Sequence, residues 1–132
     1  MTRDEIFEGV RICIADALDV ALTEITEDRK LVDDLGADSL DMLDILFQLE
    51  QRFGIKLSMR HIEKKTSEAL SGAPIEINGV YTNEAMQAIR KAMPEVPLEE
   101  LPDGLPTRNL PMSFRVATFI NLVEHTLEEN NG

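Results

Sequence analysis

One ten-residue segment of the sequence combines residue types that can carry a covalent modification. It runs Asp33-Asp34-Leu35-Gly36-Ala37-Asp38-Ser39-Leu40-Asp41-Met42. Ser39 follows a glycine that favours a tight turn, and it comes where an amphipathic helical pattern begins. The start of a helix offers unpaired backbone N–H groups and the positive end of the helix dipole. A phosphodiester on Ser39 would therefore be favourably placed, and a modifying enzyme could reach the hydroxyl at this junction of loop and helix.

Three other interpretations of this segment are a helix cap, a hydrolase nucleophile and a calcium-binding loop. Asp38 or Ser39 could serve only as the cap of the following helix. A hydrolase nucleophile needs a Gly-x-Ser-x-Gly turn and a positioned histidine, but position 41 is Asp and the only histidines are His61 and His125. A calcium loop is excluded because the spacing of the aspartates does not match an EF-hand. Both histidines are expected on the surface.

Two helical segments position this loop. Thr2 and Glu5 form a T-x-x-E capping box, and the apolar residues that follow recur at the helical period, which predicts a helix over residues 3–18. A second apolar stripe predicts a helix over residues 39–53, with Gly54 where a C-terminal cap is expected. The loop between them is expected to be held on the core by four apolar residues: Ile25, Leu31, Val32 and Leu35.

The sequence beyond Gly54 is less regular. The expected elements are a short helix from Ser58 to about residue 70, a small hairpin over 75–81, a helix from Thr82 to Pro94, a connector with five prolines over 94–111, and a final helix from near Ser113. Four leucines of the connector are available for packing: Leu98, Leu101, Leu105 and Leu110. The sum is an all-α bundle with a large irregular insertion before the last helix.

The composition excludes several classes of function. The 132 residues include 25 acidic and 13 basic ones, a net charge of −12, which argues against nucleic-acid binding and against adhesion to anionic membranes. Residues 1–54 hold 14 of the acidic and 5 of the basic residues, so the acidity belongs mainly to this part. Such a surface is expected to meet partners with basic patches. Cys13 is the only cysteine, expected in the core, and a cytoplasmic setting without a membrane-embedded segment is the expectation.

The motif Gly36-Ala37-Asp38-Ser39-Leu40-Asp41 resembles the phosphopantetheine attachment site of acyl carrier proteins. The resemblance covers residues 3–57 well and residues 113–129 more loosely. It implies a carrier, not an enzyme, with a 4′-phosphopantetheine arm on Ser39 and with Asp38 and Leu40 beside it. A phosphopantetheinyl transferase would add the arm from coenzyme A, and the terminal thiol would hold an acyl chain as a thioester.

The resemblance also implies a partner-binding surface on the second helix. Its acidic positions are Asp38, Asp41, Asp44 and Glu50, with Met42 as an apolar contact beside the serine. The implied partners are an acyl–acyl carrier protein synthetase, a ketoacyl synthase or an acyltransferase with a basic docking patch, and the carrier itself is expected to be a monomer. The implied fold is the four-helix bundle of acyl carrier proteins, here with a long insertion of one extra short helix and the proline-rich connector before the last helix. The family bundle sequesters the acyl chain between its helices, for which the candidates are Leu43, Leu46, Phe47, Val116, Phe119, Ile120 and Val123.

The sequence departs from the family pattern in three places. In the third-helix region, which is acidic in common acyl carriers, Lys56, Arg60, Lys64 and Lys65 outnumber Glu63. Residues 66–110 form an insertion within a single expected domain, residues 1–132, and Gln51 and Arg52 stand where the common pattern has acidic residues. These departures favour a specialised pathway, such as the synthesis of an unusual fatty acid or the acylation of lipopolysaccharide and lipid A. A polyketide or peptidyl carrier, and a carrier-like interaction module that is never loaded, are the alternatives.

Overall fold

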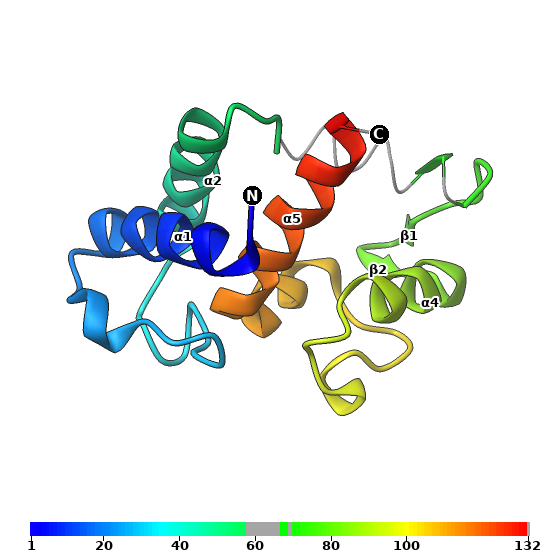
Figure 1. Cartoon of the computed structure of the whole chain (residues 1–132). Helices are drawn as coiled ribbons and strands as arrows, with labels where there is room; N and C mark the ends of the chain where they lie inside the picture. The colour runs from blue at the N-terminus through cyan, green and yellow to red at the C-terminus, as the bar shows by residue number, and fades with distance from the viewer. Residues whose placement is uncertain (58–66, 69, 132) are drawn as a thin grey trace. The chain divides into compact units, whose positions relative to one another are not determined.

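The computed structural model describes residues 1–57, 67–68 and 70–131 (Figure 1). These residues are mostly helical and include one two-stranded hairpin, which confirms the all-α class. The predicted short helix that begins at Ser58 falls largely outside the described residues. No helix in the described part of the chain is long and apolar enough to cross a membrane.

The chain divides into two compact units. The first consists of residues 1–58 and 114–132, and the second of residues 59–113. The second unit contains the whole of the predicted insertion, residues 66–110, and is slightly longer at both ends. That the two units together form one domain stays a prediction.

Helix α1 of the first unit spans Arg3–Leu18 and begins at the predicted capping box. The backbone N–H of Glu5 donates to Thr2 Oγ1 at 3.2 Å, and the backbone N–H of Thr2 donates to Glu5 Oε1 at 3.0 Å. The backbone N–H groups of Thr2 and Glu5 are therefore both satisfied by side-chain oxygens, each by the other residue's, which fixes the residue at which the helix begins.

Helix α2 spans Ser39–Phe53 and ends at Gly54, whose φ of 66° is the left-handed conformation that glycine adopts at low cost. The side of α1 that meets α2 carries Gly9. A Cβ atom at Gly9 would lie 2.5 Å from Cζ of Phe53, which is far inside van der Waals contact. The absence of a side chain at Gly9 thus lets the two helices approach closely.

Helix α5 spans Val116–Asn131 and is joined to the long loop before α2 by backbone hydrogen bonds. Leu31 N–H donates to Phe114 O, Val116 N–H to Arg29 O and Ala117 N–H to Glu27 O, each at 3.0 Å. The loop carbonyls thereby satisfy the first donors of α5. This pairing explains why α5 begins at Val116 rather than near Ser113, since Arg115 is held in a bridge with Lys30.

The core of the first unit lies where α1 packs against both α2 and α5. Of the four loop residues expected to reach it, Ile25 and Leu31 are fully buried, and Val32 and Leu35 pack against its edge. The other fully or nearly fully buried side chains come from all three helices and the segment after α2: Ile6, Val10, Cys13, Ile14, Ile45, Leu49, Ile55, Leu57, Val116, Phe119, Ile120 and Val123.

The second unit opens with the predicted hairpin, made of strands β1 (Glu76–Ile77) and β2 (Val80–Tyr81). The two residues between the strands have positive φ angles, 55° at Asn78 and 79° at Gly79, as a tight two-residue hairpin turn requires. A two-stranded ribbon alone is marginal in water. Here residues 105–107 extend it, because Tyr81 N–H donates to Leu105 O at 3.0 Å and Thr107 N–H to Gly79 O at 2.9 Å.

Helix α4 spans Asn83–Ala92 and is capped by Thr82, as predicted. Two short 3-10 helices, η2 (Leu98–Glu100) and η3 (Thr107–Ser113), follow it in the proline-rich connector. In the first unit a third one, η1 (Leu22–Glu24), follows α1.

The second unit has a hydrophobic core of its own, built from Met86, Val96, Leu101 and Leu105. Of the four connector leucines expected to pack, Leu101 and Leu105 are buried in this core and Leu110 lies at its edge. Leu98 is 71% exposed, so the expectation is wrong for that residue. Helix α4 is tied to the connector by Arg90, whose Nε donates to Leu101 O at 2.7 Å.

Candidate functional site

Ser39 is the first residue of α2 and its side chain is exposed. The N-cap of the helix is Asp38, not Ser39: the backbone N–H of Asp41 donates to Asp38 Oδ1 at 2.9 Å, and the backbone N–H of Asp38 donates to Asp41 Oδ2 at 3.0 Å. The structure therefore decides between the two possible caps. Two carboxylates hold the helix start, and the serine hydroxyl is left out of the cap.

The loop before Ser39 is held by a buried residue and a backbone hydrogen bond. Ala37 is 4% exposed, and its N–H donates to Leu31 O at 2.9 Å. Gly36 has a φ of 74°, a left-handed conformation that turns the chain into the helix. The serine is thus presented by a rigid turn anchored on the core of the first unit.

A phosphodiester fits this position on physical grounds. The first amides of a helix lack intrahelical acceptors. In α2 the amide of Asp41 donates to Asp38, and the amides of Ser39 and Leu40 lie before it at the start of the helix. The positive end of the helix dipole also favours a negative charge on the serine. The exposed side chain leaves room for an enzyme to approach the hydroxyl.

The other residues predicted for partner binding have different surroundings. Asp44 is exposed, and Gln48 Nε2 donates to its Oδ2 at 3.4 Å. Glu50 is half-buried, and its Oε2 accepts a hydrogen bond from the backbone N–H of Leu57 at 3.0 Å. Its carboxylate stabilises the turn that follows α2, a role that no spacing in the sequence indicates.

Met42, the expected apolar contact beside the serine, is nearly buried. It is 9% exposed and belongs to the core of the first unit. The buried face of α2 consists of Met42, Ile45 and Leu49, which pack into the core that α1, α2 and α5 share. The role of Met42 as a contact for partners stays a prediction.

The sequence reading missed a set of exposed apolar residues on the same helix. Leu40, Leu43 and Phe47 are 75%, 56% and 59% exposed. Leu43 and Phe47 were expected to line an acyl cavity, and the exposure contradicts this, since neither side chain is inside the bundle. Leu46 lies at the edge of the core, and the four α5 candidates (Val116, Phe119, Ile120 and Val123) are buried.

Cys13 and the histidines are the other side chains whose chemistry could form a site. Cys13 is buried, and burial raises the pKa of its thiol, which keeps it protonated and unreactive. His125 is exposed and lies 3.2 Å from Glu129, and His61 falls outside the described residues. Among the residues that the structure describes, no cluster of side chains has the composition of a metal site.

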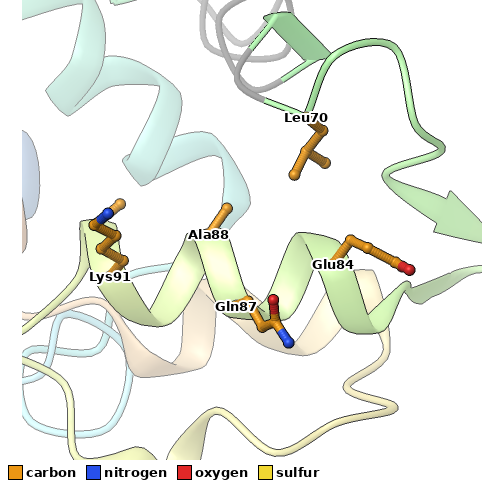
Figure 2. A pocket seen from close by; sticks show the side chains of 6 residues that line it. Leu70, Glu84, Gln87, Ala88 and Lys91 are labelled. Carbon is orange, nitrogen blue, oxygen red and sulfur yellow. The ribbon is translucent and has the colours of Figure 1, made fainter.

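A shallow groove of about 450 Å³ runs along α4 in the second unit. Figure 2 shows Glu84, Gln87, Ala88 and Lys91 on the helix and Leu70 facing them from the preceding segment. The lining holds no serine, and so no hydroxyl to which a phosphopantetheine group could be attached. Ser39 therefore remains the candidate attachment residue.

Comparisons with known proteins indicate one family. The profile of the family described as "Phosphopantetheine attachment site" matches residues 8–73, half of the chain, with Ser39 inside the match. Acyl carrier proteins of Thermotoga maritima and Petrotoga mobilis are each 44% identical to the chain, over 63 and 69 residues. These matches cover 48% and 52% of this chain and 78% and 81% of the relatives. The acyl carrier protein of Campylobacter hominis is 41% identical over 63 residues, 48% of this chain and 80% of the relative.

The chain belongs to the acyl carrier protein family. Members of this family are carriers and not enzymes, and they bear a covalently attached 4′-phosphopantetheine group. Membership also implies interaction with a phosphopantetheinyl transferase and with enzymes that handle the acyl group. These statements agree with the predictions made from the motif around Ser39.

Proposed function

We propose that Ser39 carries the 4′-phosphopantetheine arm and that the protein presents an acyl chain on it to lipid-biosynthetic enzymes. The observation that carries this proposal is the position of Ser39: it is exposed at the first residue of α2, while Asp38 and Asp41 cap the helix without it. The serine lies within the matched family region, residues 8–73. A serine that served only as a cap would occupy the position that Asp38 holds.

The residues around Ser39 have defined tasks in this proposal. During loading, the Ser39 oxygen forms a bond to the coenzyme A phosphorus that bears the pantetheine. The bond from this phosphorus to the departing 3′,5′-ADP breaks, and the hydroxyl proton passes to a base of the transferase. The start of α2 stabilises the negative charge of the resulting phosphodiester. The capping pair of Asp38 and Asp41 keeps the hydroxyl at the end of the helix. When bound, the arm supplies the thiol that holds the acyl group as a thioester.

The acyl chain itself is expected to enter the helical bundle. The candidates to contact it are the buried α5 residues Val116, Phe119, Ile120 and Val123. Burial of each methylene group is worth about 0.8 kcal/mol, which favours an apolar interior over water.

We further propose that the carrier serves a specialised pathway, such as the synthesis of an unusual fatty acid or the acylation of lipid A. Supporting this, the 63-residue match to the Thermotoga maritima protein spans most of that relative but less than half of this chain. The second unit, residues 59–113, has a core of its own, as a dedicated docking or shielding element would need. A polyketide or peptidyl carrier is the alternative, and an aminoacyl group on the arm would identify the latter.

The attachment site is tested by incubating the apo protein with coenzyme A, magnesium and a broad-specificity phosphopantetheinyl transferase. The expected result is the addition of one phosphopantetheine group, measured by intact-mass spectrometry, in the wild type and in Ser71→Ala but not in Ser39→Ala. Ser71 is a suitable control because it is an exposed serine of the second unit. A gain of mass in Ser39→Ala would refute the assignment, and an unmodified wild type would favour an unloaded interaction module.

A further inference from the structure

Two adjacent aspartates of the loop before α2 make different contacts, although their sequence positions alone do not distinguish them. Both are exposed. The carboxylate of Asp33 lies 3.8 Å from Nζ of Lys30, which makes an ion pair between two side chains. The Oδ2 atom of Asp34 instead accepts a hydrogen bond from the backbone N–H of Lys30 at 2.8 Å. The Asp34 carboxylate is therefore part of the backbone hydrogen-bond pattern of the loop, whereas the Asp33 carboxylate contacts a side chain.

The Asp34 carboxylate closes a turn around Lys30. The backbone N–H groups of Asp34 and Leu35 both donate to Lys30 O, at 3.1 and 3.2 Å. The segment around Asp34 thus engages both the N–H and the carbonyl of Lys30. A hydrogen bond from a backbone N–H to a carboxylate is stronger than one between two neutral groups. We call this arrangement the Lys30 turn.

The Lys30 turn is joined directly to the chain that enters α2. Leu31 follows Lys30, and its backbone bonds in two directions. Its N–H donates to Phe114 O at 3.0 Å, and its carbonyl accepts from Ala37 N–H at 2.9 Å. Ala37 is buried and lies two residues before Ser39. The backbone path that leads to the attachment residue is therefore held at the residue next to the Lys30 turn.

Packing of α2 on the core does not by itself fix the position of Ser39. The first buried residue of α2 is Met42, so the turn that carries Ser39 comes before the part of the helix that the core holds. Helix ends fray unless other groups hold them. Here the two-carboxylate cap holds the start of α2 from the helix side. The bond between Ala37 and Leu31 holds it from the loop side.

We propose that Asp34 is a positioning residue for the loading of Ser39. Its carboxylate closes the Lys30 turn, and this turn keeps the chain on the path that presents the hydroxyl to the transferase. The proposal rests on the proposed function. Without the acceptor, the loop and the first turn of α2 adopt other paths as well, and only a fraction of the free carrier binds productively. The KM for the carrier then rises by the inverse of that fraction, whereas kcat, which is measured on the bound carrier, is retained.

The test is steady-state loading of the full apo chain by a broad-specificity phosphopantetheinyl transferase, with coenzyme A and magnesium in excess and the carrier concentration varied. Asp34→Ala should raise the KM for the carrier about threefold to tenfold, as expected for the loss of one hydrogen bond, with kcat within about twofold of the wild type. Asp34→Asn keeps an acceptor oxygen and should restore the KM to within about twofold. Asp33→Ala is the matched control, because it removes the same charge one residue away, and its KM should stay within about twofold of the wild type.

Amide hydrogen exchange distinguishes a local effect from a general loss of stability. The Asp34 side chain is exposed, so its replacement leaves the core intact and the variant is expected to fold. In Asp34→Ala the amides of Leu31 and Ala37 should exchange at least about tenfold faster than in Asp33→Ala, while those of α1 stay protected. Equally faster exchange in α1 would show that Asp34 contributes only to global stability, and would overturn the proposal.

Three kinetic results would also overturn it. Equal KM values for Asp34→Ala and Asp33→Ala would show that the Lys30 turn has no part in loading. A KM for Asp34→Asn as high as that for Asp34→Ala would show that the charge, and not the acceptor, is what the transferase requires. A lower kcat with an unchanged KM would place the role of Asp34 after binding. A wild type that is not loaded at all would instead refute the attachment proposal itself, so the two failures are distinguishable.

Discussion

The packing of α1 against the end of α2 depends on the missing side chain at Gly9. A Cβ atom there would lie 2.5 Å from Cζ and 3.2 Å from Cε2 of Phe53, and 3.0 Å from Nε of Arg52. Phe53 packs against the core, so its ring cannot move away without loss of contacts. Overpacking of this kind costs about 1–3 kcal/mol. Alanine is also a better helix former than glycine by about 1 kcal/mol.

The balance of these two effects predicts that Gly9→Ala lowers the free energy of unfolding by about 1 kcal/mol. The measurement is urea unfolding followed by far-UV circular dichroism, since the chain has no tryptophan. The same substitution in a Phe53→Leu background should be neutral or stabilising, because the ring atoms that clash are gone. The coupling between the two sites should be about 1–2 kcal/mol.

The helix-propensity contribution is measured separately at Glu8, an exposed position of α1 next to Gly9. The difference between Glu8→Gly and Glu8→Ala gives the gain from alanine without any clash. If Gly9→Ala stabilises the wild-type protein as much as alanine does at position 8, the close packing of α1 and α2 is refuted. Additivity with Phe53→Leu would refute it as well.

Three further predictions follow from the caps and from the second core. Asp38→Ala should lower the free energy of unfolding by about 1 kcal/mol, whereas Asp38→Asn, which keeps an acceptor, should not. Equal losses of unfolding free energy in the two variants, measured by urea unfolding, would contradict the role of Asp38 as the cap. The hydrogen bonds from Thr2 lower the pKa of Glu5 below its ordinary value of 4.5. The ionised carboxylate therefore stabilises the fold at a pH above 4.5, and this stabilisation is lost as the pH falls through the lowered pKa. Glu5→Gln should therefore unfold with a shallower pH dependence in acid than the wild type, and identical pH profiles would refute the assignment. Arg90→Met should speed hydrogen exchange in residues 81–105 and leave α1 and α2 protected, because the two units have separate cores; faster exchange throughout would contradict this.

The start and end of the main helices were predictable because local residues determine them. The T-x-x-E box at Thr2 and the glycine at position 54 act within one turn of the backbone, and α1 and α2 span the predicted residues. The start of α5 was placed about three residues too early. Its position depends on a bridge between Arg115 and Lys30, which lie 85 residues apart in the sequence, and no local pattern contains that information.

The outer face of α2 was the harder part of the site to predict. This helix has apolar residues on more than one face, so periodicity alone did not distinguish Met42, which is buried, from Leu43 and Phe47, which are exposed. The placement of α1 and α5 decides which face packs. In the same way, Glu50 was counted as a surface carboxylate because the sequence does not show that the backbone of Leu57 returns to it. Ser39 could be proposed from the sequence because the features that point to it are local: a turn, a helix start and a hydroxyl.

The central claim, that Ser39 is the point of attachment, is tested most directly on the protein isolated from its own cells. Intact-mass spectrometry followed by fragmentation of the chain locates any added group on a single residue. We predict a phosphopantetheine group on Ser39, with an acyl chain on a fraction of the molecules. A protein that is wholly unmodified, or one that carries the group on any other residue, would contradict it.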